Sequence, residues 1–325
     1  MKNIKVIAFL VLIGVVVLWG VAPVVSKSIF DSNAYSPGIL IALRGVFAIL
    51  VMAIFINKGF KKVNKSYLIC IPAGIILAAA YIFQFVGLKY TTASKNAFLE
   101  NISCVTIPVF MFILVKEKPT WYSIASAFVC VIGSLFLVGN GFDFLNFFQS
   151  GSLKGDSLSA IGGLFFGLDI AFTKVFSKDK DPLLYVFFQI VTLTVVSFIY
   201  SFCFEVTGTL DTFAISYKFM DLLQVAFLGV VCTAICWVAR AWAIKFIDAV
   251  TVSLLVPLSA VVASVLSIAC QMEDFTMNLL IGGLIILVSI AISAIFDYRR
   301  ECKKKRCNEV KEEVIEQNEP NQSQL

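Results

Sequence analysis

Ten separate apolar stretches, each long enough to cross a lipid bilayer, fill most of the chain between Val6 and Phe296. An α-helix needs about 20 consecutive apolar residues to span the hydrocarbon core. The chain is 59% hydrophobic and 14% charged, against about 45–50% and about 25% in soluble domains. We therefore predict an all-α integral membrane protein with ten transmembrane helices. The expected spans are 6–26, 37–57, 67–88, 96–115, 120–139, 157–177, 183–205, 219–243, 249–271 and 275–296.

Positive charge is distributed unevenly between the two sides of the bilayer. If the N-terminus is cytosolic, the outer segments keep only Lys27, Lys89, Lys95, Lys154 and Lys218, whereas seven basic residues follow the last span. Because lysine and arginine favour the cytosolic side, we predict a multi-pass protein of the cytoplasmic membrane with both termini in the cytosol. The basic tail is expected to contact anionic lipid, so the formal charge of +5 does not indicate nucleic-acid binding.

The second half of the chain resembles the first at matching positions. A shift of 156 positions pairs Gln84 with Arg240, Lys89 with Lys245, Glu117 with Glu273 and Pro119 with Phe275. A shift of 145–147 positions pairs Gly20 with Gly167, Lys27 with Lys174, Pro37 with Pro182 and Arg44 with Gln189. The two shifts imply one loop insertion of about ten residues between the aligned blocks.

This repeat determines the expected topology. Because each half holds five helices, an odd number, the second half must enter the membrane from the opposite side, which makes the repeat inverted. Inverted repeats are typical of secondary transporters, whose substrate site lies near the midplane between the halves. The predicted units are a first repeat at 1–139, a linker at 140–156, a second repeat at 157–296 and a disordered cytosolic tail at 297–325.

Composition excludes several kinds of chemistry. The chain has no histidine, which removes histidine metal ligands and histidine general bases. It also lacks a Gly-rich phosphate loop and paired carboxylates on one helix face, and its nine cysteines are scattered. We expect no enzyme, no metal and no cofactor, which leaves transport, channel activity or a structural role.

An ionisable residue inside an expected span needs a reason, because it costs about 2.5–3.5 kcal/mol on insertion scales. Asp169 is the deepest and shares a small, polar helix face with Thr173; it is either functional or the partner of an arginine. Arg44 suits a carboxylate or phosphate of a ligand, or Asp169 itself. Glu100 either reaches the outer interface or titrates in proton-coupled transport, since without histidine a carboxylate must carry the proton.

Spans three and eight are repeat mates with matching polar faces. Span three presents Tyr81 and Gln84, and span eight presents Trp237 and Arg240. Together with Trp19 of span one, the aromatic residues are expected to form cavity walls, although ordinary helix packing would also explain them. For Arg240, near the inner end of its helix, a topology signal is an equally good explanation. Gln189, the repeat mate of Arg44, completes the candidate set.

Prolines inside spans mark expected helix breaks. Pro23, Pro108 and Pro257 each remove a backbone hydrogen bond, and such breaks often border the site in transporters, although kinks without a gating role are also common. Glu117 and Glu273 lie in short loops and are expected to cap the helices that follow them.

Several segments together resemble the EamA family of the drug/metabolite transporter superfamily. The matching pieces are LWGVAPVVSK (18–27), Arg44, GLKYTTASKNAFLENISCVTIPVFMFILVKEKPTW (87–121) and AIKFIDAVTVSLLVPLSAVVASVL (243–266). The resemblance implies ten helices in two repeats, alternating access to a central cavity, and movement of small metabolites, often amino acids. The chain departs from many relatives at Val256, where they carry Glu, and at Arg240, where Gln is frequent.

We therefore expect a secondary transporter for a small metabolite, amino-acid-like by weak preference and working as an exporter. Its partners would be the small-molecule substrate and membrane lipid. The alternatives are a facilitative permease without ion coupling and a non-transporting scaffold or lipid-binding protein. The sequence leaves substrate identity, direction, proton coupling and homodimer formation open.

Overall fold

A computed structural model describes residues 2–56, 63–116, 121–138, 153–208, 212–247 and 255–275, together with residue 252 and scattered residues between 277 and 296. All elements in this part of the chain are helical. In chain order they are α1 (Lys2–Asp31), α2 (Pro37–Ile56), the 3₁₀ helix η2 (Lys65–Ile69), α3 (Cys70–Tyr90), α4 (Ala93–Glu100), α5 (Ile102–Val115), α6 (Trp121–Val138), α8 (Leu153–Phe176), α9 (Pro182–Tyr200), the π-helix η3 (Ser201–Glu205), α10 (Phe219–Phe227), the π-helix η4 (Leu228–Ile235), α11 (Cys236–Ala243) and α13 (Pro257–Ala269).

Seven described helices are long and apolar enough to cross a membrane. They are 4–31, 37–56, 65–90, 93–115, 153–176, 182–205 and 219–243. The fifth expected span coincides with the 18 residues of α6, whereas the ninth contains the 13 residues of α13 in its C-terminal part. The tenth lies mostly outside the described residues, as do Glu117 and the tail at 297–325. The all-α membrane fold is confirmed, and the count of ten spans stays a prediction.

Two expected spans are interrupted. The fourth has one turn residue at Asn101, whose backbone N–H bonds to the Phe98 carbonyl at 2.9 Å, a tighter pattern than an α-helix, so that α4 and α5 form one span with a local break. In the ninth, a turn at Val256 precedes α13, which begins at Pro257; proline fits this first position because its missing N–H would have no helical acceptor there. Pro23 and Pro108 instead lie inside continuous helices.

Glu273 contacts the N-terminus of α4, and the expected capping of the helix that follows it stays a prediction, since that helix lies mostly outside the described residues. Its carboxylate accepts a hydrogen bond from the Ser94 backbone N–H at 3.1 Å. Ser94 belongs to the first turn of α4, whose free N–H groups attract an anion. Because α4 packs against α13, the Glu273 carboxylate, which follows α13 in the chain, lies beside this helix terminus.

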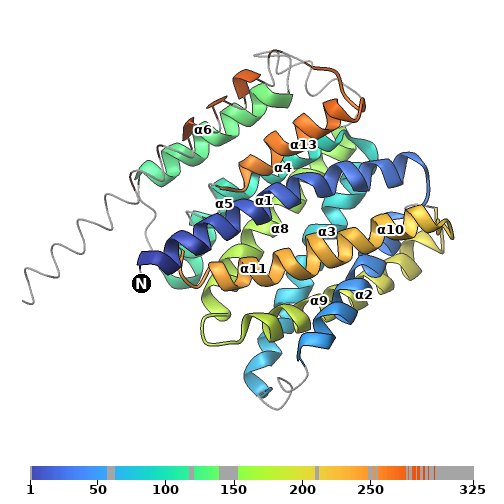
Figure 1. The fold of residues 1–325 in the computed structure, drawn as a ribbon, viewed down its shortest axis with the longest axis horizontal. Helices are drawn as coiled ribbons and strands as arrows, with labels where there is room; N and C mark the ends of the chain where they lie inside the picture. The colour runs from blue at the N-terminus through green and yellow to red at the C-terminus, as the bar shows by residue number, and fades with distance from the viewer. Residues whose placement is uncertain are drawn as a thin grey trace, which may run out of the picture.

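The main helix contacts have counterparts when the helices of one half are replaced by their repeat mates in the other half. The contact of α3 with α8 corresponds to that of α11 and η4 with α1, and the contact of α5 with α8 corresponds to that of α13 with α1. Likewise α3 on α9 corresponds to η4 on α2, while α2 packs on its own counterpart α9. Figure 1 shows one such arrangement, with α1 lying between α13 and α11. The fold therefore consists of two inverted repeats that enclose a shared centre.

Repeat-related glycines allow these helices to cross closely. A Cβ at Gly20 would lie 2.7 Å from the Ser259 carbonyl, and at its repeat mate Gly167 it would collide with the Thr106 hydroxyl and lie 3.3 Å from the Cα of Ser103, the mate of Ser259. A Cβ at Gly74 would lie 2.6 Å from the carbonyl of Gln189. The matching position in the second half would be Gly229, 2.5 Å from the carbonyl of Arg44.

The last of these pairs differs by one residue from the main alignment. Gly74 and Gly229 are 155 positions apart, whereas Gln84 and Arg240 are 156 apart. Gly229 lies at the start of the π-helix η4 (Leu228–Ile235), which ends before Arg240. Because a π-bulge accommodates one extra residue within an α-helix, η4 explains the change of register.

Lysines at corresponding helix ends also form related contacts. Lys27 Nζ donates to the carbonyls of Leu88 and Lys89 at 3.4 and 3.5 Å, at the end of α3. Its mate Lys174 donates to the carbonyls of Ile244 and Ile247, both at 2.6 Å, beyond the end of α11. A cation at a helix C-terminus satisfies free carbonyls and the helix dipole. One such lysine therefore caps a helix end in each half of the chain.

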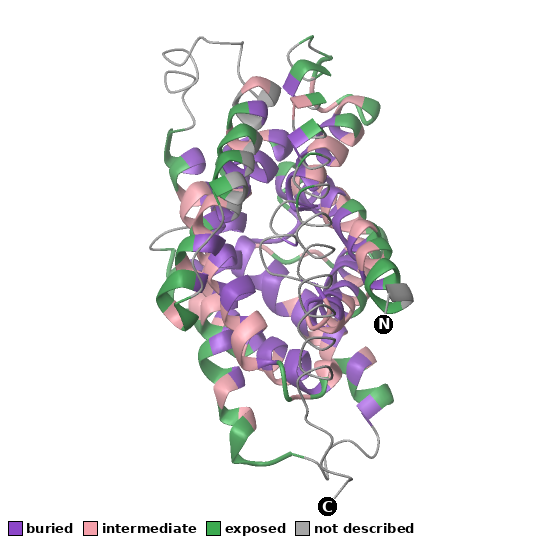
Figure 2. Cartoon of the chain, turned by 90° about the vertical axis from the view of Figure 1, so that its left-hand side faces the viewer, coloured by how far each residue is buried: buried purple, intermediate pink, exposed green. Residues whose placement is uncertain are grey.

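Burial follows the pattern expected of a protein in lipid. Buried residues line the interior of the bundle and exposed ones its perimeter (Figure 2). Large apolar side chains on that perimeter include Ile54, Phe55 and Phe202, each more than 70% exposed. In a membrane these surfaces contact acyl chains, so their exposure carries no penalty.

The close helix crossing at Gly229 predicts an asymmetric effect of two identical substitutions. Gly229→Ala forces a methyl against the Arg44 carbonyl and should destabilise the protein by about 1–3 kcal/mol. Gly14→Ala, which meets nothing within 4 Å, should be neutral or stabilise α1 by up to about 1 kcal/mol. Thermal unfolding midpoints of the purified variants compare the two, and equal midpoints would contradict the close crossing.

Candidate functional site

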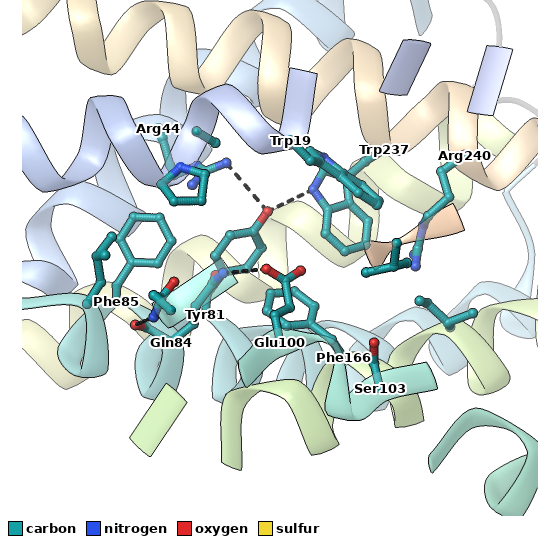
Figure 3. Close-up of a pocket in the computed structure, with 16 residues that line it drawn as sticks. Trp19, Arg44, Tyr81, Gln84, Phe85, Glu100, Ser103, Phe166, Trp237 and Arg240 are labelled. Carbon is teal, nitrogen blue, oxygen red and sulfur yellow. Dashed lines mark hydrogen bonds between the residues drawn. The ribbon is translucent and has the colours of Figure 1, made fainter. Parts of the chain in front are cut away.

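A pocket lies at the centre of the molecule, between the two repeats (Figure 3). Its cavity volume is about 40 Å³, which leaves room for a few water molecules only. Helices α1, α2, α3, α4, α5, α8 and α11 contribute to it. The lining residues are Trp19, Ala22, Pro23, Arg44, Tyr81, Gln84, Phe85, Leu88, Asn96, Glu100, Ser103, Phe166, Ile170, Trp237, Arg240 and Val256.

An aromatic cluster related by the repeat forms the middle of the pocket. The Tyr81 ring lies 5.3 Å from that of Phe166, and the Trp237 ring lies 5.4 Å from that of Trp19. Tyr81 and Trp237 are mates, as are Phe166 and Trp19, so the two contacts are equivalent. Trp237 Nε1 donates to the Tyr81 hydroxyl at 2.9 Å and joins the two halves.

Arg44 occupies one end of this cluster. Its side chain is 2% exposed, and its Nε donates to Thr233 Oγ1 at 2.9 Å. Its Nη2 lies 3.4 Å from the Tyr81 hydroxyl, and its guanidinium lies over the rings of Tyr81 and Phe85 at 4.7 and 5.3 Å. Within the described chain no carboxylate pairs with Arg44. A buried cation with only neutral neighbours favours an anionic ligand.

Glu100 faces the same pocket beside Tyr81 (Figure 3). Its carboxylate accepts a hydrogen bond from Gln84 Nε2 at 2.8 Å. Asn96 fixes the backbone around Gln84, because its Nδ2 donates to the Gln84 carbonyl at 3.0 Å and to Ser159 Oγ at 2.8 Å. No cationic partner of Glu100 is present among the described residues, so its negative charge is available to a ligand.

Asp169 pairs with Arg240 rather than with Arg44. The Arg240 Nη2 to Asp169 Oδ2 distance is 2.8 Å, and Gln189 Nε2 donates to Asp169 Oδ1 at 2.6 Å. Thr173 Oγ1 lies 3.4 Å from the same Arg240 nitrogen. Both charged side chains are 0% exposed. The sequence hypothesis of an Arg44–Asp169 pair is therefore wrong, and Arg240 is a buried member of the central network rather than a surface topology signal.

The structure brings most of the sequence-predicted residues together. Seven of them line the pocket: Trp19, Arg44, Tyr81, Gln84, Glu100, Trp237 and Arg240. Asp169 and Thr173 contact Arg240 next to the pocket, and Gln189 contacts Asp169 in turn. Pro23 also lines the pocket, whereas Pro108 does not. Sequence reasoning missed Phe85, Asn96 and Ser103, although Asn96 could have been found as an amide within an apolar span.

The sequence profile of the EamA-like transporter family matches residues 6–139 and 153–295. The chain belongs to this family. The two matched segments fall in the two halves of the chain, in agreement with the repeat-related helix contacts. The EamA family is part of the drug/metabolite transporter superfamily, so the protein is a multi-pass membrane transporter.

Similar proteins agree with this assignment. An "uncharacterized transporter" of Archaeoglobus fulgidus is 26% identical over 86% of this EamA chain and 82% of its own length. The "uncharacterized transporter YoaV" of Bacillus subtilis is 23% identical over 78% of this chain and 84% of its own. One crystal structure superimposes with a TM-score of 0.70 at 17% identity, covering 89% of this chain and 98% of its own. It supports the fold alone.

The buried ion pair behind the pocket predicts non-additive effects on stability. Asp169→Asn or Arg240→Gln alone leaves a buried charge unpaired and should destabilise the EamA protein by about 3–5 kcal/mol. The double variant removes both charges and should be more stable than either single variant. Unfolding midpoints measured for all four proteins complete a double-mutant cycle, and simple additivity would show that the two side chains are not paired.

Proposed function

We propose that the protein is a secondary transporter that moves a small zwitterionic metabolite, such as an amino acid, by alternating access to the central pocket. The observation that carries this proposal is that the aromatic pocket holds one cation and one anion, neither of which has an oppositely charged partner in the described part of the chain. Arg44 lacks a carboxylate and Glu100 lacks a cation among the described residues, and both line the same cavity. A molecule with one carboxylate and one ammonium group complements both.

Each side chain would then have a defined task. The planar guanidinium of Arg44 can bind a carboxylate through two parallel hydrogen bonds. Glu100 would accept the ammonium, a task that Asp169 cannot perform while it is paired with Arg240. Tyr81, Trp237 and Phe85 would enclose the apolar part of the substrate, as aromatic walls do in small-molecule sites.

Alternating access accounts for the small size of the cavity. Ligand pockets usually measure about 300–1,000 Å³, whereas this one measures about 40 Å³. Binding therefore requires a conformation in which the repeats separate on one side of the membrane. In our proposal the protein works in the cytoplasmic membrane, with both termini in the cytosol, as an exporter.

The Glu100 carboxylate is also the candidate for proton coupling. Because the chain has no histidine, a coupled proton would be carried by a carboxylate, and Glu100 is the one that lines the pocket. A facilitative permease is the second candidate, favoured if flux ignores both pH and an opposing proton gradient. A non-transporting scaffold predicts no solute-dependent stabilisation at all, whereas a ligand that binds the folded state raises its stability by mass action.

Flux measurements in proteoliposomes test the proposal. Arg44→Ala should abolish amino-acid uptake, because about 1.5–3 kcal/mol per charge-assisted hydrogen bond is lost, and Arg44→Lys should restore part of it. Glu100→Gln should reduce uptake and remove its response to a pH gradient. Lys218→Ala, which removes an exposed cation outside the pocket, serves as the matched control.

Two results would contradict the proposal. Uptake by Arg44→Ala equal to that of the unaltered protein would exclude the arginine as a binding residue. Loss of uptake in the Lys218→Ala control would show that the assay reports general damage. Folding of each variant is verified by its unfolding midpoint before flux is compared.

A further inference from the structure

Arg240 has hydrogen-bonding capacity that its ion pair does not use. Only Nη2 contacts Asp169 and Thr173, whereas Nε and Nη1 are buried and have no acceptor in the described part of the chain. The residue is 0% exposed and lines the central pocket. A bidentate pair would have used two nitrogens for Asp169, whereas the single contact leaves two donor nitrogens, Nε and Nη1, without an acceptor in the described residues.

Unused buried donors are costly, because each one loses its bonds to water without replacement, at about 1–3 kcal/mol. Packing holds the group in place despite this cost, since the guanidinium lies 4.1 Å over the ring of Trp237. Gln189 and Thr173 fix the Asp169 side of the pair. A rigidly held guanidinium with free donors at a cavity wall is the arrangement that recognises an oxyanion.

Arg240 and Arg44 lie at opposite ends of the aromatic pair (Figure 3). Arg44 contacts Tyr81, Tyr81 is bonded to Trp237, and Trp237 is covered by Arg240. The charged residues that line the pocket are these two arginines and Glu100. A complementary solute has two anionic groups, separated by a short chain, and one ammonium group.

We propose that Arg240 forms a second anion subsite, which makes the substrate an acidic amino acid or a closely related aminodicarboxylic acid. This inference rests on the proposed function, because it assigns Arg44 to the α-carboxylate and Glu100 to the ammonium. The free Nε and Nη1 donors of Arg240 bind the second carboxylate, while Nη2 stays with Asp169. The subsite distinguishes acidic from neutral amino acids of equal size.

Glutamate and glutamine provide a matched pair of probes, since they differ in one terminal group and have nearly the same shape. Concentration-dependent thermal stabilisation and competition for uptake measure the affinity of each. One charge-assisted hydrogen bond contributes about 1.5–3 kcal/mol, which corresponds to a preference for glutamate of at least about tenfold. Equal affinities for glutamate and glutamine would overturn the proposal.

Two variants test whether Arg240 is the cause. Arg240→Lys retains the charge opposite Asp169 but removes the free guanidinium donors. Arg240→Gln combined with Asp169→Asn removes both charges together and leaves no unpaired ion. The ratio of glutamate to glutamine affinity should fall at least about tenfold in both variants. An unchanged ratio in either folded variant would assign the selectivity elsewhere.

The failure of this inference can be told apart from failure of the proposed function. If Arg44-dependent uptake of glutamine or leucine occurs without a preference for glutamate, the zwitterion site stands and the second subsite is rejected. If no amino acid stabilises the protein or is taken up, the proposed function itself fails. The Arg44→Ala variant therefore accompanies every comparison.

Discussion

The cost of placing charge in a membrane governs the centre of this protein. Arg240 and Asp169 are fully buried within helices that cross the bilayer, and they can remain there because they contact each other at 2.8 Å and are held by Gln189 and Thr173. Arg44 meets the same constraint differently, through a hydroxyl and two aromatic rings. Arg240 has a carboxylate partner in Asp169, whereas Arg44 has none among the described residues.

Much of the fold could be predicted from the sequence. Apolar length predicts the spans, and the paired positions of Gly20 with Gly167 and Arg44 with Gln189 predict the inverted repeat, because the helices must repeat their contacts when the chain repeats its pattern. The residues of the site were also recognisable, since a charge such as Glu100 within a span is unfavourable without a partner.

The partners of those charges could not be predicted. Whether Asp169 pairs with Arg44 or Arg240 depends on how helices from different halves are rotated against each other, which no local pattern records. The division of the fourth span at Asn101 and the π-helix η4 are equally local departures within apolar sequence. The only sign of η4 in the sequence is a change of one residue in the alignment, between the pair Gly74–Gly229 and the pair Gln84–Arg240. Thr233 lies within η4 and accepts the hydrogen bond from Arg44.

The glycine crossings have a consequence for motion. Where Gly229 meets the Arg44 carbonyl and Gly20 meets the Ser259 carbonyl, the helix backbones approach each other closely, and the side chains of Phe47 and Val262 pack at the same points. At such a contact the two helices cannot move closer together, but they can change their crossing angle. Because the crossings occur in equivalent places in both repeats, they would serve, in the alternating access that we propose, as the points about which one repeat tilts against the other.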